Sequence, residues 1–313
     1  MNFALRWLGQ QARWALPAGV LLGIAWPQLA SATRPLLAAA VVGTLVAALL
    51  RMDWARMWGW VRQPAWPLAF TLWLTLLSPL LVSVLCGLLE VPDAWVVLLV
   101  LQAAGPPIGS AAAFAMFLGL EASLCMVTTV WATLSLPLTL TLIVAGLLPH
   151  YGIEVELWPF FWRVLTLVVL PFVIAASLRR WLGAAWLKAR DAELAGLNVV
   201  MLVIFALAVM EGVQDVLLQD TPLAMKLLGV ATGSVVLWHL LGHALCRWAG
   251  LNTAYTSALL TGNRNMGMLL VVTAGTAGTW FSLYVAIVQI PMYCAPLLLG
   301  PWLARSRQAK PGV

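Results

Sequence analysis

The stretch Leu260-Thr261-Gly262-Asn263-Arg264-Asn265-Met266-Gly267 decides the fold class of this chain. It lies in the middle of an apolar segment, residues 253–276, so its arginine falls near the centre of an expected membrane span. An arginine at that depth costs roughly 3 to over 10 kcal/mol. The flanking glycines and asparagines are poor helix formers and predict a break in the helix. A charge beside a break is tolerated only where protein packs around it or where it lines a wet cavity, so we expect a transport site here.

Composition places the rest of the chain in a lipid bilayer. The chain has 313 residues, of which 63% are hydrophobic and 9% charged, whereas a soluble domain carries about 25% charged residues. Long apolar runs recur, which predicts an all-α polytopic membrane protein. The net charge of +6 therefore indicates basic cytoplasmic loops and no nucleic-acid partner. The four cysteines form no CxxC pair, so neither a disulfide framework nor a zinc site is indicated.

The apolar runs divide into ten expected spans. The first resembles a signal peptide, with Leu29-Ala30-Ser31-Ala32 as the cleavage site, but we interpret it as a span because its removal would unbalance the two halves described below. The fourth contains Gly105-Pro106-Pro107-Ile108-Gly109, where two prolines remove backbone donors and predict a second break. The expected spans are residues 14–29, 35–50, 66–89, 94–118, 122–148, 158–178, 197–218, 223–248, 253–276 and 280–303.

The basic residues fall on one side of this layout. With the N-terminus inside, thirteen of the 17 lysines and arginines lie in inside segments, up to Lys310 in the tail. Arg34, Arg163 and Lys226 lie outside, and Arg264 is the remaining one. Because positive charge marks the cytoplasmic side, we predict a multi-pass protein of the plasma (inner) membrane with both termini in the cytoplasm.

The two expected breaks occupy matching positions in the chain. Spans four and nine are each the fourth in a set of five. Because five is an odd number of crossings, the second set must start on the opposite side of the membrane and is inverted relative to the first. We therefore predict two inverted repeats, residues 14–148 and 158–303. Interrupted spans at matching positions of two halves indicate the binding site of a secondary transporter.

Polar groups and special backbone positions near the breaks are the candidate substrate-binding residues. Free N–H groups at half-helix N-termini attract anions, and free carbonyls at C-termini attract cations. Arg264 either binds a substrate anion or caps the carbonyls of the broken helix, and both alternatives place it at the crossing. Asn263 and Asn265 either satisfy the backbone of the break or bind substrate. The candidates are Pro106, Pro107, Ser110, Thr128, Thr133, Gly262, Asn263, Arg264, Asn265 and Gln289.

Three further titratable residues lie inside expected spans. His239 and His243 are four residues apart, a spacing that fits a metal pair, a proton relay or helix packing; without a third ligand nearby we predict no metal site. Glu211 is the only acid well inside a span. It is a candidate for proton coupling or for a counter-charge to Arg264, or it faces an outer vestibule.

Two local motifs resemble those of the bile acid:sodium symporter family. Gly105-Pro106-Pro107-Ile108-Gly109-Ser110 looks like that family's break in span four, and Gly262-Asn263-Arg264-Asn265-Met266-Gly267 looks like its span-nine break, usually Gly-x-Gln-Asn-x-Gly. The resemblance implies a core of residues 66–148 and 223–303, in which the broken helices cross. It also implies a panel of residues 14–50 and 158–218, with a substrate cavity between panel and core.

The departures from the family motif concern the sodium sites. The family uses a Glu where this chain has Leu260, a Gln where it has Arg264, and an Asn where it has Ala111. Three neutral groups without a carboxylate make a poor sodium site. The sodium-site residues of the family that this chain retains are Ser110, Thr128 and Asn265. Because a guanidinium repels sodium, we predict sodium-independent behaviour, with Arg264 standing where bound sodium would be.

Three classes of function follow. The first is a secondary transporter of a small-molecule organic anion, working by alternating access with no cofactor. The second is a non-transporting receptor or scaffold that kept the fold; Arg264→Ala separates the two, since a transporter should lose flux while still folding. The third, a membrane enzyme, is disfavoured because the sequence shows no nucleophile–base pair or metal cluster, and only His239 and His243 support it.

Overall fold

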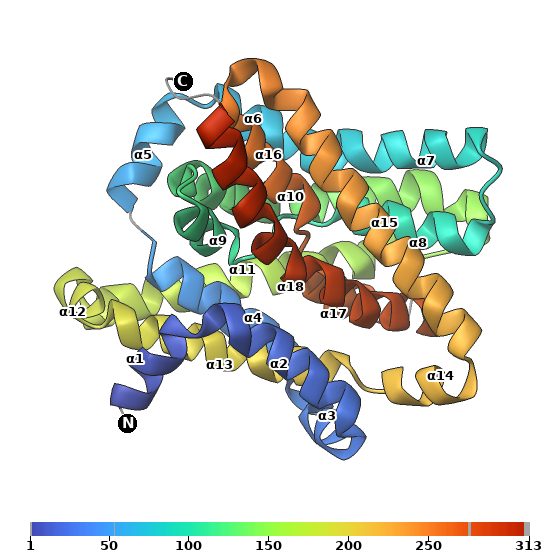
Figure 1. Cartoon of the computed structure of the whole chain (residues 1–313), viewed down its shortest axis with the longest axis horizontal. Helices are drawn as coiled ribbons and strands as arrows, with labels where there is room; N and C mark the ends of the chain where they lie inside the picture. Colours follow the sequence, from blue (N-terminus) through green and yellow to red (C-terminus); the bar gives the residue numbers. More distant parts are fainter. Residues whose placement is uncertain (1, 53, 275–276, 310–313) are drawn as a thin grey trace.

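The computed structural model of the chain describes residues 2–52, 54–274 and 277–309. Within these ranges the chain is helical and contains no strand (Figure 1). Seven of the described helices are long and apolar enough to cross a membrane, and two shorter apolar helices cover Trp14–Ala25 and Asp93–Ala104. The protein is therefore an all-α polytopic membrane protein, as its composition predicts.

The helices of the first half follow the expected spans within a few residues. Proline explains two local departures. The first span ends at Ala25 because Pro27 starts a new helix, and a π-turn precedes Pro79, which has no N–H to continue the ladder. The elements are α1 (Asn2–Gln10), α2 (Ala12–Ala25), α3 (Pro27–Thr33), the 3₁₀ turn η1 (Arg34–Leu36), α4 (Leu37–Leu50), α5 (Trp54–Arg62), α6 (Ala65–Leu72), the π-turn η2 (Trp73–Leu77), α7 (Ser78–Leu88), α8 (Asp93–Ala104), α9 (Ala111–Leu118) and α10 (Ala122–Leu147).

The second half differs from expectation in its seventh span, which is broken. Gly212 adopts φ 78°, a left-handed conformation that glycine tolerates because it has no Cβ. Thr276, the expected end of span nine, and Lys310 lie outside the described residues. The elements are the 3₁₀ turn η3 (Leu148–Tyr151), α11 (Leu157–Leu182), α12 (Ala184–Ala189), α13 (Asp191–Val209), α14 (Val213–Gln219), α15 (Thr221–Cys246), the 3₁₀ turn η4 (Arg247–Ala249), α16 (Leu251–Gly262), α17 (Met266–Val272) and α18 (Gly278–Ala309).

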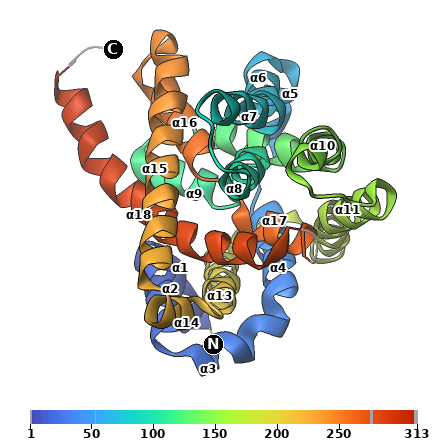
Figure 2. The same cartoon turned by 90° about the vertical axis from the view of Figure 1, so that its right-hand side faces the viewer.

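The helices gather into two groups that face each other. In Figures 1 and 2, α1–α4 and α13 lie together on one side, and α5–α10 with α16 lie on the other. Helix α13 packs against α1, α2 and α4, whereas α15 packs against α16 and α18. Helix α11 contacts both α4 and α10, so it bridges the groups. The two helix breaks, between α8 and α9 and between α16 and α17, are buried in the interior.

Candidate functional site

The two breaks predicted from the sequence lie against each other. Helix α8 ends before Gly105 and α16 ends at Gly262, and the extended segments that follow pair as a short antiparallel bridge between Pro107 and Arg264. The Ile108 N–H donates to the Asn263 carbonyl at 2.9 Å, and the Asn265 N–H donates to the Pro106 carbonyl at 2.7 Å. Each break thus satisfies backbone groups that the other leaves free, as a non-helical segment at membrane depth requires.

Arg264 is completely buried at this crossing, with 0% of its surface exposed. Its Nε donates to the Thr261 carbonyl at 2.8 Å. Its Nη1 donates to the carbonyls of Leu74 at 2.8 Å and Gly105 at 2.9 Å, and its Nη2 donates to the Ser78 hydroxyl at 3.1 Å. The guanidinium also lies 5.5 Å from the centre of the Trp238 ring. All of these partners are neutral groups of the protein.

The carbonyls around Arg264 are free because of helix ends and irregular turns. Gly105 and Thr261 belong to the C-terminal ends of two half-helices, where carbonyls lack helical partners and carry partial negative charge. Leu74 lies in the π-turn before Pro79, where the hydrogen-bond ladder is displaced. Three inward-pointing carbonyls and a hydroxyl form a site for a cation, and the guanidinium occupies it. Of the two sequence alternatives for Arg264, the structure shows carbonyl capping.

Both asparagines of the second break also serve its own structure. The Asn263 side-chain amide donates to the Leu259 carbonyl at 3.1 Å and lies 3.0 Å from His239 Nε2. His239 Nδ1 lies 2.7 Å from the Val235 carbonyl, an acceptor, so Nδ1 carries the proton and Nε2 accepts from Asn263. Asn265 caps α17, with its Oδ1 accepting from the Met268 N–H at 3.1 Å.

The other polar candidates form a second class, because they have no partner. Within the described part of the chain, no hydrogen bond reaches the hydroxyls of Ser110, Thr128 and Thr133 or either amide atom of Gln289. Most threonines in these helices bond back to their own helix, as Thr129 does to the Cys125 carbonyl. Among the other unpartnered groups of the described residues are Asn198 Oδ1 and the Tyr293 hydroxyl, which the sequence did not indicate because neither residue lies near a break in the chain.

Several of these unpartnered groups face cavities between the two helix groups. A narrow pocket of about 20 Å³ lies beside the crossing, and its walls include Ser110, Asn198, Gln289 and Tyr293. That volume accommodates about one water molecule. A larger cavity of about 160 Å³ lies between α4, α9, α10 and α13, and an adjoining one of about 220 Å³ extends toward α1 and α2. Ser110 and Asn198 line all three.

The remaining candidates lie elsewhere. Pro106, Pro107 and Gly262 shape the crossing, and Gly262 is required because a Cβ there would lie 2.0 Å from His239 Nδ1. Thr133 lines a small pocket of about 30 Å³ near α4. Glu211 is not the counter-charge of Arg264: its carboxylate pairs with Arg34 at 3.3 Å, with 40% of the side chain exposed.

The two histidines do not form a pair. His243 packs edge-on against the Tyr255 ring at 5.0 Å, while His239 contacts Asn263. No group of three or more metal-ligating side chains occurs among the described residues. Both histidines therefore have packing or hydrogen-bonding roles in this structure.

The fold and the crossing together define a class: an all-α polytopic membrane protein with two broken helices that meet in its interior. Comparison with models of known protein families and with curated proteins finds no match for the chain. The argument for function therefore depends on the site itself.

Proposed function

We propose that the protein is a secondary transporter of an organic anion that works by alternating access and does not use sodium. The observation that carries this proposal is the Arg264 guanidinium, which fills a buried site of three carbonyls and one hydroxyl where two broken helices cross. Broken helices that meet at membrane depth are typical of secondary transporters, where the freed backbone groups serve ions and substrates.

The arrangement of the helices supports the same proposal. We infer ten spans in two inverted five-span repeats, with the breaks in the fourth span of each, as in the bile acid:sodium symporter family. The group α1–α4 with α13 corresponds to the expected panel, to which we also assign α11, and the cavities lie between it and the helices of the expected core. A transporter needs a cavity at such a boundary, because movement of one helix group against the other then opens the cavity to one side of the membrane or to the other.

Sodium independence follows from charge. Carbonyl and hydroxyl oxygens are the ligands that hard cations prefer. Here a fixed cation already contacts four of them, and the position of the family's Glu is Leu260, which is fully buried. A sodium ion beside an unneutralised guanidinium in a low-dielectric interior would be strongly repelled. Transport of the anion in this proposal therefore does not require sodium.

We infer that both termini are cytoplasmic and that the two larger cavities belong to the inner half of the protein. Their wall includes Arg51, which lies in a basic connector at the end of α4. Neighbouring ion pairs of Arg6 with Glu193 and of Arg51 with Asp191 mark the same end. Basic residues concentrate on the cytoplasmic side of membrane proteins, in this proposal the plasma (inner) membrane.

Uptake into proteoliposomes tests the proposal. We expect a panel of labelled organic anions to include one that the reconstituted protein accumulates equally in sodium and potassium buffers. A sodium-specific rise in uptake or in thermal stability would overturn sodium independence. Anion binding without flux would instead identify a receptor.

The choice of variant follows from the hydrogen bonds. Arg264→Ala would test folding as much as flux, because Arg264 holds the crossing together. Ser110→Ala is better, since the Ser110 hydroxyl has no partner to lose among the described residues and faces the cavities. We expect reduced flux with unchanged folding, while Ser135→Ala, which removes only a bond to the Ala132 carbonyl within α10, should leave flux unchanged.

A further inference from the structure

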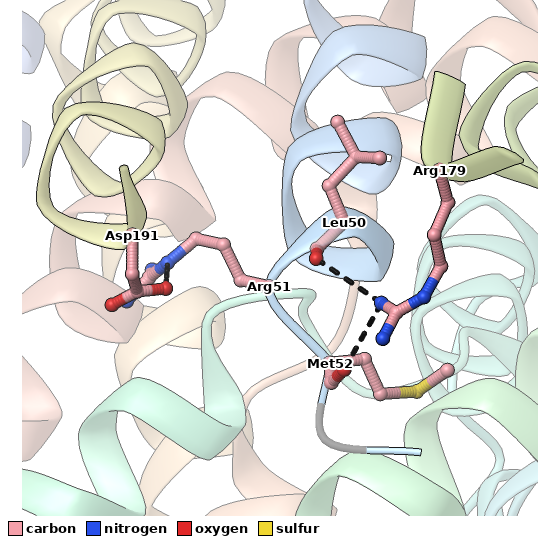
Figure 3. A network of polar contacts seen from close by, with 5 residues as sticks. All are labelled: Leu50, Arg51, Met52, Arg179 and Asp191. Atoms are coloured by element: carbon pink, nitrogen blue, oxygen red, sulfur yellow. Dashed lines mark hydrogen bonds and ion pairs between the residues drawn. The ribbon is translucent and has the colours of Figure 1, made fainter. Parts of the chain in front are cut away.

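Arg51 belongs to the wall of both larger cavities, whereas its ion-pair partner belongs to neither. Its Nε donates to Asp191 Oδ1 at 2.9 Å and its Nη2 donates to Oδ2 at 3.3 Å (Figure 3). The Arg51 side chain is 21% exposed and that of Asp191 is 53% exposed. The cation is thus the more enclosed partner, and it is held from the solvent side by the first residue of α13.

Two neutral groups without partners share those cavity walls with Arg51. The Ser110 hydroxyl and Asn198 Oδ1 are more than nine-tenths buried, and within the described ranges neither is hydrogen-bonded. Buried polar groups are nearly always satisfied, so groups left free beside a cavity are suited to a ligand. Much of the remaining wall is apolar, including Met57, Met116 and several alanines.

We propose that Arg51 binds the anionic group of the substrate, and that Asp191 is a built-in competitor that holds the guanidinium when no anion is bound. This inference rests on the transporter function proposed above and specifies its substrate. The substrate class is a small monoanion, a carboxylate or sulfonate, with an apolar body. The single positive side chain and the two neutral polar groups match the one charged group of such a substrate. The methionine- and alanine-rich wall matches its apolar body.

The exchange from Asp191 to substrate is energetically accessible. An ion pair with an exposed partner contributes little to stability, because water screens it. A substrate carboxylate inside the cavity meets the same planar guanidinium with less water around it, so its paired hydrogen bonds are stronger. Asp191 therefore lowers the apparent affinity for the substrate anion without preventing its binding.

The neighbouring charges provide matched controls. Arg6 and Glu193 form a similar ion pair, at 2.8 Å, between α1 and the same end of α13, but neither lines the two cavities. Arg179 lies on the other side of the α4 end from Asp191 and donates to the carbonyls of Leu50 and Met52 (Figure 3).

Binding of simple probes to the purified full-length protein tests the inference. Hexanoate, hexanesulfonate and the neutral hexanamide are titrated, with thermal stabilisation as the readout. We expect both anions to bind and hexanamide not to bind. Arg51→Gln should weaken hexanoate binding by about tenfold or more, the loss of charged hydrogen bonds. Asp191→Asn should tighten it about two- to fivefold, the release of an exposed ion pair. Glu193→Gln should leave it unchanged.

The outcomes separate this inference from the proposed function. Equal hexanoate affinity in the wild type and Arg51→Gln, equal binding of hexanamide, or no binding of any probe to the wild type overturns the inference. The tightening expected for Asp191→Asn cannot arise from misfolding, so the test survives if Arg51→Gln is unstable. Flux into proteoliposomes that persists in Arg51→Gln overturns the inference alone, whereas hexanoate binding without flux of any anion in the wild type overturns transport alone.

Discussion

Two arginines in this protein perform the same chemical task in opposite surroundings. Arg264 donates to three carbonyls and a hydroxyl at 2.8–3.1 Å with no exposed surface. Arg179 donates to the carbonyls of Leu50 and Met52, both at 3.4 Å, and lies over the Trp54 ring at 5.6 Å near the cytoplasmic end in the proposed topology. Each guanidinium caps carbonyls at the end of a helix.

The comparison teaches that burial, more than the type of contact, sets the importance of a capping arginine. When a buried arginine is lost, its acceptors find no water, and each unsatisfied acceptor costs about 1–3 kcal/mol. When a partly exposed arginine is lost, water replaces it. The two sites should therefore respond very differently to the same substitution.

The largest expected effect is that of Arg264→Met. We expect it to destabilise the protein by about 3–5 kcal/mol, because three buried carbonyls and one hydroxyl lose their donor and this cost exceeds what is gained by no longer burying an unpaired charge. Thermal unfolding of the purified protein in detergent, followed by the loss of the folded elution peak, measures it. Arg264→Lys should be intermediate, since an ammonium keeps the charge but lacks the planar reach to four acceptors. A mild effect of Arg264→Met would mean that burial is not the deciding factor.

Gly262→Ala sharpens the comparison by disturbing the crossing without touching its charge. A Cβ at Gly262 would lie 2.0 Å from His239 Nδ1 and 2.1 Å from its Cε1, so the histidine has to move. Overpacking of this kind costs about 1–3 kcal/mol. Gly233→Ala in α15 is the control: its Cβ would meet no atom within 4 Å, so the same change should be neutral or slightly stabilising. Equal melting temperatures for the two variants would contradict this packing argument.

His239→Leu should have a somewhat smaller effect on the same crossing. It leaves the Asn263 amide with the Leu259 carbonyl as its remaining acceptor, so the loss is that of one hydrogen bond with the donor still satisfied, about 0.5–1.5 kcal/mol. His243→Leu is the control, because His243 contacts an aromatic ring instead of the break. If zinc stabilised the wild type and His243→Leu abolished that effect, the histidines would form a metal pair after all.

Sequence reasoning found the helix breaks because their causes are local. Paired prolines and a glycine–asparagine cluster disrupt a helix wherever they occur, and the structure confirms both interruptions within a residue or two. The ambiguity of Arg264 was resolved largely by residues distant in the sequence, beside the nearby Thr261 carbonyl. The Leu74 carbonyl comes from a π-turn in another span, and although Pro79 was visible in the sequence, the direction in which that turn displaces its carbonyls was not.

The cavity wall was harder to predict for the same reason. Asn198 and Tyr293 are single polar residues in apolar helices, a pattern that also occurs in residues that merely pack. In the sequence, Arg51 is one of many basic residues expected in cytoplasmic segments, and only the fold brings it beside Ser110. The break in the seventh span had a signal, Gly212, but an isolated glycine near a helix end is common and specifies no particular conformation.

Arg179→Met is the smallest expected effect and completes the comparison. Its long hydrogen bonds and its contact with the Trp54 ring lie in a partly exposed region, so we expect a loss of less than about 1 kcal/mol. The stability difference between wild type and Arg179→Met should shrink further in high salt, whereas that for Arg264→Met should not, because salt screens exposed charges and leaves buried ones unaffected. A salt-independent and large loss at Arg179 would show that this helix end is sealed from water. The two arginines would then be equivalent, and this end of α4 would belong to the water-excluded interior of the protein.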